Sequence, residues 1–286
     1  MEFQQHNLKK AAFFHIIAWF FFASGYLVSK MITFKTTVPM MLFFRGLIPT
    51  LLLLPVMIHH GWHSFRVSSP GWLVLRCLAT TATITLIFLS VRTIPLVDTT
   101  LLTNSAPFFV PFIALALLKK AINHRLWLPV AFGFIGVILI LHPTPDLLKL
   151  GALFALGSGI MTALSGIVSR ELVGKITTHT LLFYLFFSSL LLSIPFVVFY
   201  WEFSWDTFFP LILIGIFILI AQWAFFRSFR YAEASYVAPF GYSCVLFGGL
   251  FDWIFFSDFP SLSTWIGMIF VIASGSWILW HNRSIV

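Results

Sequence analysis

The chain consists of long apolar runs separated by short polar turns. A bilayer-spanning helix needs about 20 mostly apolar residues, and these runs are of that length. They do not alternate with polar positions, so the pattern favours membrane helices over the strands of a membrane barrel. We predict ten helices, over residues 11–30, 37–57, 71–91, 95–118, 126–142, 149–169, 179–200, 208–229, 232–255 and 262–281.

The first apolar run follows Lys9 and Lys10, as the core of a signal peptide would. It continues past Phe22 without a small-residue cleavage site, and many further runs follow it. We therefore interpret it as the first membrane helix.

The composition agrees with this pattern. The 286 residues are 60% hydrophobic and 9% charged, and the mean hydropathy is +1.00. So few charges cannot cover the surface of a soluble domain of this size. Ten spans take up roughly 200 residues, which leaves no room for a soluble domain. The sequence predicts an all-α integral membrane protein.

The placement of the basic residues predicts the orientation, because Lys and Arg concentrate on the cytoplasmic side. Counting from a cytoplasmic N-terminus, the inner ends of the helices hold Lys9, Lys10, Arg66, Arg76, Lys119, Lys120, Arg125, Arg170, Lys175, Arg227, Arg230 and Arg283. The outer ends hold only Lys30, Lys35, Arg92 and Lys149. We expect both termini in the cytoplasm and a plasma-membrane location, the inner membrane in a bacterium. The net charge of +8 reflects this placement, not nucleic-acid binding.

Short motifs recur half a chain apart. The run SGYLVSK from Ser24 is echoed by SGIVSR from Ser165, and GVILIL from Gly136 by GSWILW from Gly275. Five helices per copy is an odd number, so the second copy would be inverted, as in many secondary transporters. We expect two inverted five-helix repeats, over residues 1–145 and 146–286. The alternative is a chance match between helices of similar composition.

A few polar side chains lie inside the predicted helices. Arg45 is eight residues into a span, where a charge costs about 3 kcal/mol on insertion scales. It either fixes helix packing or contacts a substrate carboxylate by a bidentate contact. Gln222 lies among apolar residues and needs a partner in lipid.

Proline interrupts two predicted helices at matching places in the two halves. Thr100 and Asn104 are one turn apart, just before Pro107, and Tyr242 follows Pro239. Proline frees a backbone carbonyl, and such breaks tend to border the cavity of a transporter. Asn104 and Tyr242 either bind a ligand or make interhelical hydrogen bonds worth about 1 kcal/mol.

Aromatic and hydroxyl side chains add weaker candidates. Trp19 and Tyr26 are seven residues apart and share a helix face, where they either stack on a ring or pack. Thr81 lies in a threonine run whose hydroxyls can also bond to their own helix. The small residues of the fifth and tenth helices, Gly133, Gly136, Gly267, Ser274 and Gly275, predict close helix contact.

The order of several motifs resembles the EamA-like branch of the drug/metabolite transporters over nearly the whole chain. These motifs are FFRG from Phe43, the Leu75-Arg76 step, APFGY from Ala238 and the acidic turn around Asp258. One departure is the pair Lys119-Lys120, where the family often has an acidic residue. The resemblance implies amino acids, nucleoside-like compounds such as S-adenosylmethionine, other polar metabolites or amphipathic drugs as substrates.

The sequence therefore favours a secondary transporter of a small polar or zwitterionic metabolite, working by alternating access. A receptor or assembly subunit and a membrane-embedded enzyme are the alternatives; the enzyme would need paired acids or a His-acid cluster, and none is evident. The sequence contains no phosphate-cradling motif, so it does not favour an ATP-driven pump.

We expect no cofactor and no metal. The expected partners are the substrate and lipid, and a homodimer through the last helix of each half is a further alternative. The candidate substrate-binding residues are Trp19, Tyr26, Arg45, Thr81, Thr100, Asn104, Gln222 and Tyr242.

Overall fold

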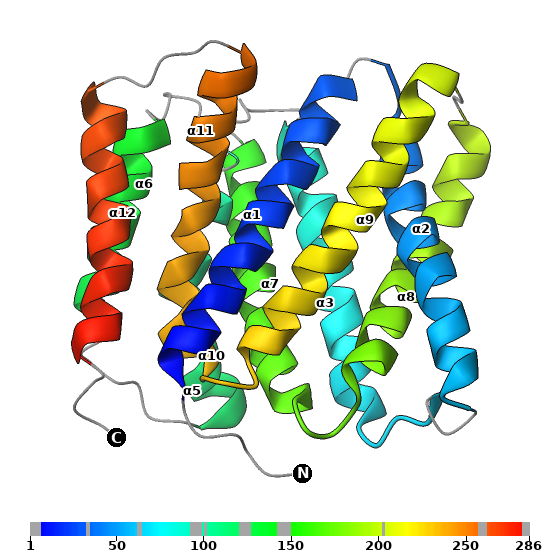
Figure 1. The fold of residues 1–286 in the computed structure, drawn as a ribbon, viewed down its shortest axis with the longest axis horizontal. Coiled ribbons are helices and arrows are strands. Elements are labelled where there is room, and N and C mark those ends of the chain that lie inside the picture. Colours follow the sequence, from blue (N-terminus) through cyan, green and yellow to red (C-terminus); the bar gives the residue numbers. More distant parts are fainter. Residues whose placement is uncertain are drawn as a thin grey trace.

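The computed structural model describes residues 7–32, 35–61, 65–91, 99, 102–119, 127–141, 150–201, 204–256 and 262–281. Within these ranges the chain is an all-helical bundle (Figure 1), and Val173 and Ile176 form the one isolated bridge there. The helices are α1 (Leu8–Ile32), α2 (Val38–His59), α3 (Pro70–Val91), α5 (Ala106–Leu118), α6 (Trp127–Leu141), α7 (Leu150–Leu172), α8 (Thr178–Phe199), α9 (Trp205–Ser228), α10 (Ala234–Val237), η4 (Ala238–Tyr242), α11 (Ser243–Phe256) and α12 (Leu262–His281).

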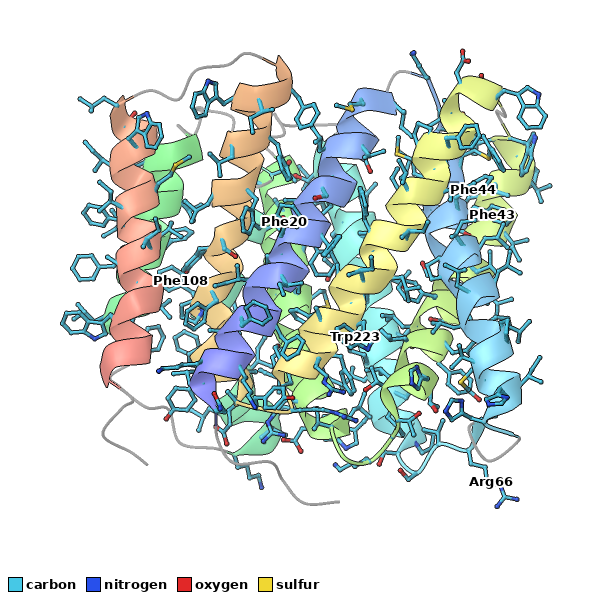
Figure 2. The ribbon with its side chains drawn as sticks, in the orientation of Figure 1. Phe20, Phe43, Phe44, Arg66, Phe108 and Trp223 are labelled. Atoms are coloured by element: carbon cyan, nitrogen blue, oxygen red, sulfur yellow. The ribbon has the colours of Figure 1, made fainter. Side chains whose placement is uncertain are left out.

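The number of apolar helices agrees with the prediction from the sequence. Six described helices are long and apolar enough to cross a membrane, and four shorter apolar helices accompany them. In Figure 1 they run side by side between two faces, and α1 begins and α12 ends at the same, lower face. Figure 2 shows Arg66 at that face, between α2 and α3, with mostly carbon-rich side chains at mid-height.

The expected proline breaks are confirmed in both halves. The helix predicted over 95–118 is not continuous, because the chain turns at Asn104 and Ser105 and α5 then begins with Pro107 in its first turn. The helix predicted over 232–255 is divided into α10, the 3₁₀ turn η4 with Pro239 in its first turn, and α11. Each proline lacks the N–H that a continuous helix would use at that position.

The helices associate mainly across the two halves of the chain. The largest contacts join α1 to α9, α3 to α7, α2 to α8 and α6 to α12. Smaller contacts join α2 to α9, α3 to α8, α5 to α7 and α1 to α11. Each helix of the first half thus has a main neighbour in the second half.

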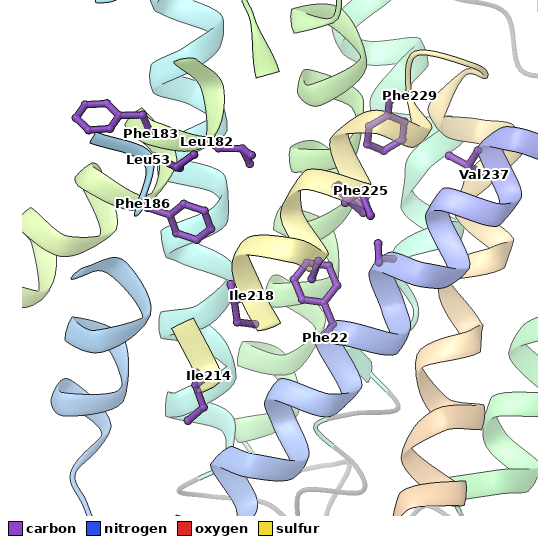
Figure 3. Packing of buried hydrophobic residues seen from close by; sticks show 14 of the residues in the cluster. Phe22, Leu53, Leu182, Phe183, Phe186, Ile214, Ile218, Phe225, Phe229 and Val237 are labelled. Atoms are coloured by element: carbon purple, nitrogen blue, oxygen red, sulfur yellow. The ribbon is translucent and has the colours of Figure 1, made fainter. Parts of the chain in front are cut away.

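The largest apolar cluster lies between α1, α2, α8 and α9. Phe22 on α1 lies beside Ile218 and Phe225 of α9 (Figure 3). Because lipid is as apolar as these side chains, close contact between helices, not removal from water, holds such a cluster together in a membrane.

Small residues bring α6 and α12 into backbone contact, as the sequence predicts. A Cβ atom on Gly136 would lie 2.6 Å from the carbonyl oxygen of Gly267. The hydroxyl of Ser274 on α12 donates to the carbonyl of Pro129 on α6 at 2.6 Å. This seam therefore tolerates no larger side chain at Gly136 without a shift of the backbone.

Both cysteines of the chain are buried and unpaired. Cys77 lies on α3 and Cys244 on α11, and each is 8% exposed.

Candidate functional site

Arg76 is the most deeply buried charged residue in the described part of the chain. It lies six residues after the first residue of α3, about 9 Å along the helix axis. Its side chain is 1% exposed, so it does not reach the face of the bundle. A guanidinium in this position must find its partners inside the bundle.

Three helices supply those partners. Nη1 of Arg76 donates to the hydroxyls of Thr80 on α3 and Ser165 on α7. Nη2 donates to the amide oxygen of Gln222 on α9 at 3.0 Å. Arg76 and Thr80 belong to the first half of the chain, and Ser165 and Gln222 to the second. The site therefore lies between the two halves.

A row of hydroxyls on α7 extends this site along the helix. Ser158, Thr162, Ser165 and Ser169 recur at intervals of three or four residues, which places them on one face. The hydroxyl of Ser158 lies 2.7 Å from that of Thr103, next to the break before α5. The buried hydroxyl of Thr162 has no partner in the described structure. The row thus connects the Arg76 cluster to the broken helix.

Aromatic rings of α1 and α9 border the other side. The guanidinium carbon of Arg76 is 5.9 Å from the centroid of the Phe225 ring, close enough for a cation–π contact. The same ring has its centroid 5.2 Å from that of His15 and 6.3 Å from that of Trp19. Nδ1 of His15 lies 3.1 Å from the hydroxyl of Ser228.

The partners of Arg76 are all neutral. An arginine at the centre of a membrane helix costs about 3 kcal/mol on insertion scales, and Arg76, nearer to a helix end, costs no more than that. Hydrogen bonds to a charged group are worth about 1.5–3 kcal/mol each. Three such bonds offset the cost and fix the side chain. They leave its positive charge without a carboxylate from the described residues.

The predicted site residues fall into several groups in the structure. Gln222 is a member of the Arg76 cluster, and Trp19 borders it through Phe225. Thr81 does not join the cluster: its half-buried side chain lies one position beyond Thr80, and its carbonyl accepts the hydroxyl of Thr85.

Arg45 and Tyr26 form a second, separate pair. The two side chains interact electrostatically across α2 and α1, and the Tyr26 side chain is 45% exposed. Arg45 follows the start of α2 by seven residues, and Tyr26 precedes the end of α1 by six. Both ends lie at the upper face in Figure 1, so this pair and the Arg76 cluster lie toward opposite faces.

Tyr242 and Asn104 lie at the two helix breaks. Tyr242 is fully buried, its hydroxyl donates to the carbonyl of Val130 at 3.3 Å, and its ring occupies the space that a Cβ on Gly133 would need. This geometry gives Tyr242 a role in joining η4 to α6, and its contact with a substrate stays a prediction. Asn104 is half-buried in the turn before α5. Thr100 lies outside the described residues.

The sequence prediction omitted Arg76, Thr80 and Ser165 from the site. In the sequence, Arg76 belongs to the basic residues at the inner ends of the helices, and Ser165 stands out only as part of a repeat motif. The available signal was the position of Arg76 five residues inside the predicted helix 71–91, the same criterion that selected Arg45.

Comparison with known proteins identifies the family. A sequence model of the EamA-like transporter family matches residues 9–142 and again residues 149–280. A solved crystal structure has the same fold, with a TM-score of 0.81 at 14% identity over 99% of both chains.

Several named relatives are about a quarter identical to the chain. The S-adenosylmethionine uptake transporter of Rickettsia prowazekii is 25% identical over 91% of this chain and 87% of its own length. The riboflavin transporter of Vibrio cholerae is 25% identical over 77% and 75%, and the pseudopaline exporter of Pseudomonas aeruginosa is 25% identical over 93% and 95%. These are transporters and not enzymes. The chain is a membrane protein and belongs to the EamA-like transporter family.

Proposed function

We propose that the chain is a secondary transporter that carries a small polar or zwitterionic metabolite across the membrane by alternating access. The observation that carries this proposal is the Arg76 cluster, a buried polar site between the two halves of a bundle whose family consists of transporters. Sites of this kind, at the interface between two repeats, are where secondary transporters hold their substrates.

The two halves act as inverted repeats, residues 1–145 and 146–286. The family model matches each half separately, which supports this division. The helix contacts support it as well, because exchanging the halves turns the α1–α9 contact into α7–α3 and the α5–α7 contact into α11–α1. The α2–α8 and α6–α12 contacts map onto themselves. A bundle with this exchange symmetry can open toward either face by equivalent movements.

The substrate is a small metabolite with polar groups and an apolar or ringed part, amino-acid-like or S-adenosylmethionine-like. The relatives named for S-adenosylmethionine, riboflavin and pseudopaline support a small metabolite. The neighbourhood of Arg76 supports the mixed character, since a guanidinium, two hydroxyls and an amide lie beside the rings of Phe225 and Trp19.

Both termini are cytoplasmic in this proposal. Two observations support this orientation. Helix α1 begins and α12 ends at one face, and basic residues lie near helix ends at that face: Lys9 and Lys10 in α1, Arg170 in α7 and Arg227 in α9.

A homodimer through α12 would bury residues that otherwise face lipid. Ile269 and Ile272 of α12 are exposed and apolar, so a second copy of the chain and lipid would compete for the same surface.

The test is solute counterflow in proteoliposomes loaded with a metabolite panel. The site variants are Ser165→Ala and Gln222→Leu. The matched control is Ser193→Ala. Ser193 lies on α8, which contributes no residue to the Arg76 cluster, and its hydroxyl bonds to the carbonyl of Leu190 in the same helix.

We expect accelerated exchange of one solute by the wild type and by Ser193→Ala, and slower exchange by both site variants. Size-exclusion chromatography of each purified protein checks that it is folded. Absence of exchange across a broad panel, by folded wild-type protein, would favour the non-transporting receptor or assembly subunit.

A further inference from the structure

The guanidinium of Arg76 has donors that the described structure leaves unused. It carries five N–H groups. The two on Nη1 are taken up by Thr80 and Ser165, and one of the two on Nη2 by Gln222. The N–H of Nε is buried and has no partner in the described structure. Nη2 has two N–H groups, and Gln222 takes up one of them. Nε and Nη2 flank one edge of the planar group, so a ligand at that edge would lie beside the unused Nε donor and within reach of Nη2.

That edge has the geometry that a carboxylate recognises. Two parallel N–H groups of arginine and two oxygens of a carboxylate form a bidentate pair that is stronger than a single neutral hydrogen bond. The ring of Phe225 lies 5.9 Å from the guanidinium carbon, so a ligand bound to the guanidinium would also have an aromatic ring nearby.

The charge balance indicates a single negative charge. Arg76 is 1% exposed, and each of its partners among the described residues is a neutral hydroxyl or amide. One carboxylate would neutralise the guanidinium, whereas a second would leave a negative charge buried, which is costly.

A second unused donor lies near the same ring. Nε1 of Trp19 is buried and without a partner in the described structure, and the Trp19 ring is 6.3 Å from that of Phe225. The two unused donors thus come from α1 and α3, on helices that both contact the second half of the chain. A ligand with an anionic group at Arg76 and an acceptor for the indole would satisfy both.

We propose that Arg76 binds the carboxylate of the transported solute through Nε and Nη2, so that the substrates are monocarboxylates. This inference rests on the proposed transport function. Gln222, Thr80 and Ser165 act as positioning residues: they hold the guanidinium so that its free edge stays available. Arg45 is less suited to this task, because its side chain is only half-buried, whereas Arg76 is 1% exposed.

The experiment compares carboxylates with their amides by ligand-induced thermal stabilisation of the purified full-length protein. The probes are two matched pairs, L-phenylalanine with L-phenylalaninamide and L-methionine with L-methioninamide. Each pair differs only in the carboxylate. The variants are Arg76→Gln, Arg76→Lys and Arg45→Gln. Arg66→Gln is the matched control, because Arg66 is exposed at the lower face.

We expect at least one carboxylate to stabilise the wild type and Arg66→Gln at a concentration at least tenfold lower than its amide. Arg76→Gln should bring this ratio close to one. Arg76→Lys keeps the charge but loses the second parallel bond, so its ratio should lie in between. It also serves as the deciding variant where Arg76→Gln does not fold.

Three results would overturn the inference: no carboxylate preference in the wild type, an unchanged preference in the Arg76 variants, or loss of the preference in Arg45→Gln alone. Counterflow of the same probes separates the two proposals. Transport without carboxylate preference refutes the Arg76 inference only, and carboxylate binding without transport refutes the transport function only.

Discussion

Replacing Gly136 by alanine should separate α6 from α12. The new Cβ would lie 2.6 Å from the carbonyl oxygen of Gly267, 2.9 Å from Cγ2 of Val271 and 3.0 Å from Cβ of Phe270. Ordinary contacts begin near 3.4 Å, so α12 must retreat by about 0.8 Å. The contacting oxygen belongs to the backbone, so no side-chain rotation can relieve the clash.

The loss of unfolding free energy can be worked out from this displacement of α12. A gap of 0.5–1 Å forfeits about a quarter to a half of the dispersion energy of each affected contact, and overpacking of this kind costs about 1–3 kcal/mol. The helix itself gains about 1 kcal/mol from a Gly→Ala change. A second glycine supplies the reference: Gly248 on α11 has nothing within 4 Å of its Cβ position, so Gly248→Ala receives the helix gain without the clash.

The assay is thermal unfolding of both variants in detergent, followed by intrinsic fluorescence. Gly136→Ala should unfold several degrees below Gly248→Ala, as a difference of about 1–3 kcal/mol implies. Folded Gly136→Ala should retain counterflow, because the Arg76 cluster lies on α3, α7 and α9. Equal Tm values for the two variants would refute the described contact between α6 and α12.

Three further substitutions test other contacts by the same Tm measurement. Tyr242→Phe removes the 3.3 Å bond to Val130 and should cost about 0.5–1 kcal/mol while counterflow is retained; loss of counterflow at unchanged Tm would instead place the hydroxyl on the substrate. Ser274→Ala removes the 2.6 Å bond to Pro129 and should cost about 0.6–1.7 kcal/mol, more than Ser243→Ala, whose hydroxyl bonds within the Phe240 turn. Lys119→Gly should raise the free energy of unfolding by about 1 kcal/mol, and the Tm with it, because Lys119 ends α5 with a φ of 53° that is unfavourable for an L-residue; a lower Tm would show that the lysine side chain matters more than its backbone.

The fold was largely predictable because the lipid environment restricts the backbone to helices whose hydrogen bonds are internal. Lipid requires every backbone group to bond within its own helix, so the apolar runs alone fix the type and rough bounds of the helices. The run 126–142 is α6 (Trp127–Leu141), and 262–281 is α12 (Leu262–His281). Pro107 and Pro239 marked the two breaks because proline acts locally, without help from tertiary contacts.

The site was only partly predictable because it depends on which helix faces meet. Gln222 was found because an amide among apolar residues needs a partner wherever it points. Thr80 and Thr81 are equivalent in sequence, yet neighbouring positions point in different directions from a helix, and only the contact with α7 selects Thr80. The depth of Arg76 likewise follows from how α7 and α8 pack against α3 and from the reach of Gln222 on α9, which hydropathy alone does not reveal.

The two buried cysteines make the native chain a ready background for site-specific labelling. Cys77 and Cys244 are the whole thiol content of the sequence, and each is enclosed by neighbouring helices. Thiol reagents act on accessible thiolates, so the folded wild type should stay nearly unlabelled. New cysteines at exposed positions, such as Arg66→Cys at one face and Trp205→Cys in the first turn of α9, would then carry paired spectroscopic probes. Distances between such probes would report movements during transport without first removing the natural thiols.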